Sequence, residues 1–358
     1  MKYIVLVEMP ISIIELDSST KEEYTTLILG KNILLKIIED SKKQSLLENN
    51  VVKNLVSIPD LCHDGIRLLV EELIQKEDSI VPHWTRTFEM EGITLPHETA
   101  LSDDDTPLNV TWDEVDEKIS NVRVKPETAI PLEELQRGIS ELLYTIAGKT
   151  SRTDLEIENK KLVSIGNKFK TKTGFEILVP SNLLRCPECQ IILSTKEFSG
   201  SKKCYICKKE IKREDAERIY IHKVNDQVKN VWERNLWFEA YLARLLRKLD
   251  CRTWTGVHVM GASGILHEVD VLAIRDGTVL IAECKTGKVS RNDVFNYCTK
   301  IGDLKSHISI LALIKKLPEP ETREFVKKNP AIIRLENMGK MKEVDILSEL
   351  RDRLSIKG

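Results

Sequence analysis

The chain has 358 residues, of which 41% are hydrophobic, and its 54 basic and 56 acidic residues give a net charge of −2. This composition is typical of a folded globular protein of two or three domains and excludes a disordered chain. The near-neutral charge neither requires nor excludes a nucleic-acid partner. No apolar run reaches the length of a signal-peptide core with its cleavage site or of a membrane span, so we expect a cytoplasmic protein without a membrane partner.

We expect an N-terminal α/β domain of unknown role over residues 1–90. Its first strand is predicted at 3–9, and helical spacing is found over 20–43 and 65–76. Residues 91–130 are predicted to be an acidic linker, because the stretch 89–117 holds ten acids and no Lys or Arg.

The next segment, 131–180, is expected to be a helical and basic connector. An amphipathic helix is predicted from Pro131 to Gly148, and five lysines between positions 160 and 172 precede the first cysteine pair.

Four cysteines with paired spacing predict a zinc ribbon over 181–215. Two Cys-x-x-Cys pairs, Cys186 with Cys189 and Cys204 with Cys207, are separated by fourteen residues. Four thiolates suit tetrahedral Zn²⁺, and a closed thiolate site is structural, because catalysis needs an open position. Eight cysteines in a chain this long otherwise indicate buried thiols rather than a disulfide framework.

Basic residues surround these cysteines and suit contact with phosphates. The candidates on the ribbon are Lys202, Lys203, Lys208 and Lys209. A solvated basic face explains them equally well. They support one alternative function, a non-catalytic zinc-ribbon protein that binds nucleic acid.

Residues 226–358 have a clearer pattern. We predict a helix over 226–249, a strand over 253–260, a two-stranded hairpin over 264–288 and a helix that begins near Ser290. Buried strands at 308–314 and 331–335 and a final helix follow. The predicted core order is α-β-β-β-α-β.

The hairpin has a predictable register. Asp276-Gly277 is a favoured two-residue turn, so cross-strand partners have numbers that sum to 553. Asp270 is then expected opposite Glu283, with Glu268 opposite Lys285, and all four on one face.

Two carboxylates this close repel each other unless a proton or a cation lies between them. Oxygen ligands suit Mg²⁺ or Mn²⁺, so Asp270 and Glu283 are candidate metal ligands. Lys285 beside them can stabilise charge on a phosphate or position a water molecule. Glu239 lies within the apolar stripe of the preceding helix, where an unpartnered carboxylate is costly, so we expect it to reach the same site. The alternative is a solvent-facing hairpin with surface ion pairs.

Asp270, twelve intervening residues and Glu283-Cys284-Lys285 resemble the signature of the PD-(D/E)xK nuclease superfamily. The resemblance implies a restriction-endonuclease-like core over about 226–345 and a metal-dependent endonuclease active in antiviral defence or DNA processing. It also implies Asp270 and Glu283 as ligands of Mg²⁺ or Mn²⁺, Lys285 as the catalytic lysine and Glu239 as the acid of the first core helix. DNA is the favoured substrate on this resemblance, with RNA as the alternative.

The stretches WERNLWFEAYL and HEVDVLAIRDGTVLIAECKTGK are similar to the nuclease domain of CRISPR-ancillary CARF nucleases. This similarity implies a third alternative, in which a cyclic oligonucleotide bound to the N-terminal region activates the nuclease. A homodimer would suit cleavage of both strands. Lys300, in the helix after the hairpin, is a further candidate contact to the substrate backbone.

Overall fold

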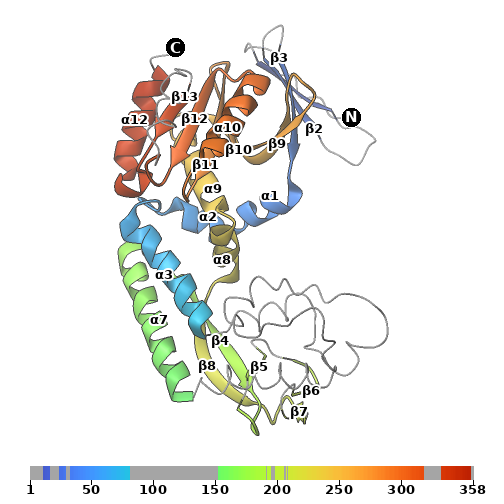
Figure 1. Ribbon diagram of the computed structural model, residues 1–358, viewed down its shortest axis with the longest axis vertical. Coiled ribbons are helices and arrows are strands. Elements are labelled where there is room, and N and C mark those ends of the chain that lie inside the picture. Colours follow the sequence, from blue (N-terminus) through green and yellow to red (C-terminus); the bar gives the residue numbers. More distant parts are fainter. Residues whose placement is uncertain are drawn as a thin grey trace, which may run out of the picture. The chain divides into compact units, whose positions relative to one another are not determined.

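The computed structural model describes residues 11–16, 24–29, 33–80, 152–190, 192–194, 198–204, 207, 209–317 and 332–355. The predicted strand at 3–9, the acidic linker and the helix at 131–148 lie outside these residues. The chain divides into two compact units, one of residues 1–74, 165–177 and 224–358, the other of residues 75–164 and 178–223. Both belong to a mixed α/β protein (Figure 1). Among the described helices, none is long and apolar enough to cross a membrane.

The first unit contains an eight-stranded sheet in the order β1-β2-β3-β9-β10-β11-β12-β13. The strands are β1 (Ile11–Leu16), β2 (Tyr24–Leu29), β3 (Ile33–Glu39), β9 (Arg252–Met260), β10 (Leu266–Arg275), β11 (Thr278–Lys285), β12 (Ile308–Leu313) and β13 (Ile332–Leu335). Neighbours from β1 to β11 are antiparallel, and β11, β12 and β13 are parallel. Segments from both ends of the sequence therefore share one sheet.

The helix predicted over 20–43 is wrong. The structure has β2 and β3 there, paired with each other, and β3 pairs with β9 from Ile37–Val259 to Glu39–Val257. The sequences YTTLIL and ILLKIIE are rich in β-branched residues, which favour strands, so this composition decided against the helical spacing. The helix predicted at 65–76 is confirmed as part of α3 (Asp64–Ile80).

Helices α1 (Ser41–Glu48) and α2 (Asn50–Ser57) connect β3 to α3. The core elements then follow in the predicted order: α8 (Asp226–Glu233), α9 (Leu236–Arg247), β9, β10, β11, α10 (Arg291–Leu304) and β12, with η1 (Met338–Lys340) and α12 (Glu343–Ser355) near the end. The single helix predicted over 226–249 is two helices, because Asn235 adopts a left-handed conformation with φ 59°. This break places Glu239 in the first turn of α9.

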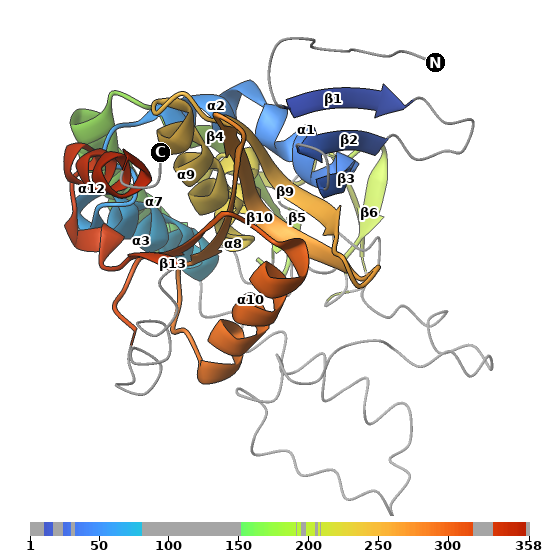
Figure 2. The ribbon, with the colours of Figure 1, turned by 90° about the horizontal axis from the view of Figure 1, so that it is seen from above.

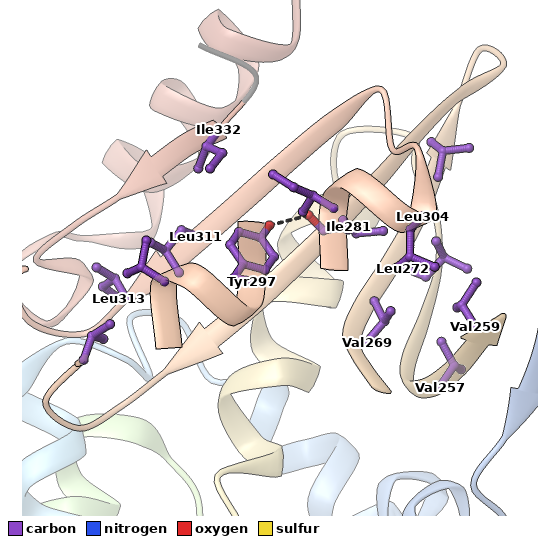
Figure 3. Packing of buried hydrophobic residues seen from close by; sticks show 14 of the residues in the cluster. Val257, Val259, Val269, Leu272, Ile281, Tyr297, Leu304, Leu311, Leu313 and Ile332 are labelled. Atoms are coloured by element: carbon purple, nitrogen blue, oxygen red, sulfur yellow. Dashed lines mark hydrogen bonds between the residues drawn. The ribbon is translucent and has the colours of Figure 1, made fainter. Parts of the chain in front are cut away.

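Helices α9 and α10 lie on opposite faces of the sheet (Figure 2). On the α10 side, buried apolar residues from the strands pack against the helix (Figure 3). Tyr297 of α10 lies in this cluster and is 2% exposed. Its hydroxyl is within hydrogen-bond distance of the carbonyl oxygens of Ile281, at 3.2 Å, and Ile310, at 2.9 Å. This contact ties α10 to β11 and β12.

We expect Tyr297→Phe to lower the free energy of unfolding by about 1–3 kcal/mol, because two buried carbonyl groups lose their shared donor. Urea unfolding of the full chain measures it. Tyr220→Phe is the matched control, since Tyr220 of β8 (Glu217–Val224) is 75% exposed, and it should change stability by less than about 0.5 kcal/mol. Equal stability of the two variants would contradict the assigned role of the hydroxyl.

An ion cluster at the other end of α9 holds this helix against α12. The buried carboxylate of Glu343 pairs with Arg244 and, at 2.5 Å, with Lys248. Burial raises the pKa of Glu343, but Arg244 and Lys248 lower it below its usual value overall. The helix that carries Glu239 is thus fixed at its C-terminal end by a charged pair whose disruption would leave a buried charge unpaired.

The second unit includes the first part of α7 (Arg152–Thr173) and five strands. These are β4 (Leu178–Arg185), β5 (Ile192–Ser194), β6 (Ser201–Lys203), β7 (Glu210–Lys212) and β8. They form a three-stranded sheet, β5-β4-β8, and a two-stranded one, β6-β7. A small buried cluster that includes Leu184, Leu193 and Ile211 packs around the cysteines.

Candidate active site

The predicted hairpin register is confirmed near the turn. Arg275 pairs with Thr278, and the ladder continues to Val271 opposite Ala282. Asp276 and Gly277 both have positive φ, 47° and 77°, as a tight two-residue turn of this kind requires. The local sequence alone therefore determines the first five pairs.

Beyond Val271 the two strands part. The ladder stops one step before Asp270 and Glu283, and the Oδ2 atom of Asp270 instead accepts a hydrogen bond of 2.7 Å from the backbone N–H of Cys284. Strand β11 continues in pairing with β12, where Glu283 lies opposite Leu311. The carboxylate of Asp270 therefore lies against the backbone of β11 directly beside Glu283.

The predicted pairing of Glu268 with Lys285 is wrong. Glu268 pairs in register with His258 of β9, and its carboxylate binds Lys43. The pair does not form because the β10–β11 ladder ends at Val271. The β9–β10 ladder is irregular at the same point, since it skips Asp270, and Gly256 of β9 has a φ of 57°. Val269 and Leu272 both belong to the core on the α10 side, so strict alternation does not hold across Asp270.

Glu283 is the centre of a charged group. Its carboxylate is 2.9 Å from Nζ of Lys285 and 2.6 Å from Nζ of Lys300. The side chains of Glu283 and Lys300 are 12% and 17% exposed, so this ion pair is largely shielded from water, whereas the Lys285 side chain is 35% exposed. Lys300, which the sequence indicated as a contact to a substrate backbone, is thereby placed in the candidate site.

Glu239 is the most deeply buried acid of the group, with 7% of its surface exposed. Its Oε2 atom has no hydrogen-bond partner. Burial, followed by the negative charge of Asp270, raises the pKa of Glu239 to about 9. Burial and the neighbouring Glu283 raise the pKa of Asp270 to about 6. Both shifts arise first from burial and then from the negative charge of a neighbouring carboxylate.

Lys43 was missed by the sequence analysis. It extends from α1 and pairs with Glu268, 225 positions later in the chain. Burial alone would lower the pKa of its amine, but Glu268 and the charges of Glu239 and Asp270 raise it above its ordinary value. Lys43 is therefore protonated beside the acids. No short-range pattern could have indicated a contact made through the β3–β9 pairing.

A serine and a histidine near the site have a different role. Ser263 Oγ and His267 Nε2 are each 2.7 Å from Oδ2 of Asp303, and the backbone N–H of Ser263 donates to Oδ1. Since both side chains contact the same carboxylate, the histidine does not activate the serine. The hydrogen bonds from Ser263 and His267 lower the pKa of Asp303 to about 2. The cluster fastens the β9–β10 loop to α10.

The donor set of the acidic group fits a hard divalent cation. Carboxylate oxygens are the ligands that Mg²⁺ and Mn²⁺ prefer. The buried Oε2 atom of Glu239 has no hydrogen-bond partner, and a cation nearby would offset the cost of burying it. Asp270 and Glu283 could hold such an ion, with Glu239 close by. Within the described residues, no three carboxylates gather as tightly as the cysteines do.

The four predicted cysteines are brought together. The Sγ atoms of Cys186, Cys189, Cys204 and Cys207 all lie within 4.8 Å of one another, a group that can hold a metal ion such as zinc. Four thiols fit zinc because structural zinc sites usually have four ligands in tetrahedral geometry, often cysteine sulfur atoms. Of the ribbon lysines, Lys202 and Lys203 lie on β6, Lys209 pairs with Glu188 at 2.8 Å, and Lys208 lies outside the described residues.

No family model matches the chain, and no curated protein matches it. Among solved structures, a protein of unknown function, AF1548, is 21% identical with a TM-score of 0.28, covering 33% of this chain and 67% of its own. Protein VC1899 from Vibrio cholerae is 12% identical with a TM-score of 0.38, covering 90% of this chain and 60% of its own.

The third structure is Can2 from Sulfobacillus thermosulfidooxidans in complex with cyclic tetra-adenylate. It is 14% identical with a TM-score of 0.30, covering 69% of this chain and 57% of its own. The chain thus spans 60% of VC1899 and 57% of Can2. At these TM-scores no family assignment follows.

Proposed function

We propose that the chain is a divalent-metal-dependent nuclease of the PD-(D/E)xK type that hydrolyses phosphodiester bonds, with DNA as the favoured substrate. The observation that supports it is that Asp270 lies beside Glu283, which pairs with Lys285, while the negative charge of Asp270 acts on the buried acid Glu239. Buried acids with raised pKa values beside a lysine are typical of a catalytic site rather than of a solvent-facing hairpin.

Each side chain has a part in this proposal. Asp270 and Glu283 would hold Mg²⁺ or Mn²⁺, which supplies positive charge and lowers the pKa of a bound water. The Cys284 N–H fixes the orientation of Asp270 through its 2.7 Å bond. Glu283 holds Lys285 at 2.9 Å, where the ammonium group can stabilise negative charge that develops on the phosphate. Lys300, bound to the other oxygen of Glu283, prevents that carboxylate from rotating away.

The test is a cleavage assay with the zinc-loaded full chain. Supercoiled DNA, single-stranded DNA and RNA are incubated with Mg²⁺, with Mn²⁺ and with a chelator. We expect cleavage only when the divalent ion is present. A parallel arm contains cyclic tetra-adenylate, because the sequence resemblance to CRISPR-ancillary nucleases suggests an activator of this class.

Three outcomes separate the candidate functions. Cleavage that needs the cyclic nucleotide would favour a nuclease activated by this ligand. Cleavage without it would favour a nuclease that needs no activator. Salt-sensitive binding of nucleic acid with no turnover in any arm would contradict the nuclease proposal and favour a ribbon that binds nucleic acid without cutting it.

A further inference from the structure

Lys43 is held in the acidic site by its own helix. Asp40 caps α1 by accepting hydrogen bonds from the backbone N–H groups of Lys42, at 2.9 Å, and Lys43, at 3.2 Å. One turn on, the side chain of Gln44 donates to the carbonyl oxygen of Thr255 in β9 at 2.7 Å. These contacts fix the start of α1 against the strand that runs beside Asp270.

Gly256 provides the space that the Lys43 side chain occupies. A Cβ atom added at Gly256 would lie 2.8 Å from Cδ of Lys43, 3.5 Å from Oε2 of Glu239 and 3.6 Å from Nζ of Lys43. The ammonium group of Lys43 and the unpartnered oxygen of Glu239 therefore border one small volume. A larger residue at position 256 would fill that volume, and its positive φ would be strained as well.

The cations of the site are divided between the acids. Lys285 and Lys300 bind Glu283, whereas Lys43 binds Glu268 and lies beside Glu239. Removing Lys43 would take from Glu268 its ion-pair partner and from Glu239 a neighbouring positive charge, while Lys285 and Lys300 would still act on Asp270. A divalent cation would be attracted to the same carboxylates as Lys43. The two positive charges would then repel each other over a short distance.

We propose that Lys43 is an internal counter-ion, supplied from outside the α-β-β-β-α-β core, that competes with the divalent cation for the acidic site. This inference rests on the proposed function, since it concerns the same carboxylates. It adds a means of regulation: any movement of α1 that withdraws Lys43 would raise the affinity of the site for metal. The segment that includes β3 and α1 would then control loading of the site.

Titration calorimetry with Mn²⁺ on the zinc-loaded full chain tests the proposal. We expect Lys43→Met to bind Mn²⁺ at least about tenfold more tightly than the wild type, because one positive charge has left the site. Lys43→Arg, which keeps the charge, should stay within about threefold of the wild type. The matched control is Lys42→Met in the same turn of α1: among the described contacts, the exposed Lys42 side chain has no carboxylate partner, so this variant should leave the affinity unchanged.

The outcomes separate this inference from the proposed function. If Lys43→Met binds Mn²⁺ with wild-type affinity or more weakly, while Asp270→Asn abolishes binding, the metal site stands and the counter-ion role is overturned. If no variant shows binding that depends on Asp270, both proposals are overturned. Near-ultraviolet circular dichroism checks that each variant is folded, and Lys43→Arg provides the comparison if Lys43→Met is not.

Discussion

Asp270→Asn should reduce metal-dependent cleavage by at least about a hundredfold, the loss typical when one preorganised electrostatic group is removed. The substitution keeps the size of the side chain, and an amide oxygen can still accept the hydrogen bond from Cys284 N–H. It removes the negative charge that a divalent ion needs. Initial rates on a labelled duplex in saturating Mn²⁺ measure the effect, with Mn²⁺ binding as a second readout.

Asp276→Asn is the matched control for this experiment. Asp276 is at the tip of the same hairpin, its side chain is 86% exposed, and asparagine tolerates its positive φ well. We expect wild-type cleavage from this variant. If Asp270→Asn also cleaves at the wild-type rate, the three acids are structural and the active site lies elsewhere.

Cys204→Ser should have the largest effect on stability, because the four grouped cysteines can hold a metal ion such as zinc. Cys204 is fully buried, and the small apolar cluster of the second unit packs around it. Because small sites of this kind depend on the metal for folding, we expect Cys204→Ser to lose bound zinc. Residues 184–216 should then exchange their amide hydrogens at least about tenfold faster. Zinc content by mass spectrometry and hydrogen exchange of the intact chain measure both effects.

Cys298→Ser is the control for the thiol itself. Cys298 is a half-buried cysteine of α10 that belongs to the first unit and is not one of the four grouped cysteines. This variant should keep a full complement of zinc and normal exchange in residues 184–216. Unchanged zinc content in Cys204→Ser would show that the four thiols do not hold zinc together.

Local chemistry made part of the site predictable from sequence. The Asp276-Gly277 turn determined the hairpin register, and the cysteine spacing predicted the group of thiols. Both features depend on residues close together in the chain. The burial of Glu239 was also predictable, because its carboxylate lies within the apolar stripe of a helix.

Long-range packing determined the features that the sequence did not predict. The parting of β10 and β11 at Asp270 depends on β9, where Gly256 takes a positive φ, and on the parallel partner β12. Lys43 reaches the acids only because β3 pairs with β9. The strands at 24–29 and 33–39 were mistaken for a helix. Short apolar segments fit both the helical and the strand periodicity, and only their pairing with other strands decides between the two.

The pairing of β3 with β9 has a practical consequence for anyone who shortens this chain. Without residues 1–40, β9 would become the border of the sheet, with unsatisfied N–H and C=O groups from Val257 to Val259. An exposed edge strand of this kind pairs with strands of other molecules and promotes aggregation. An isolated fragment that starts after β3 should therefore precipitate when concentrated, whereas one that retains β1 to β3 should remain in solution.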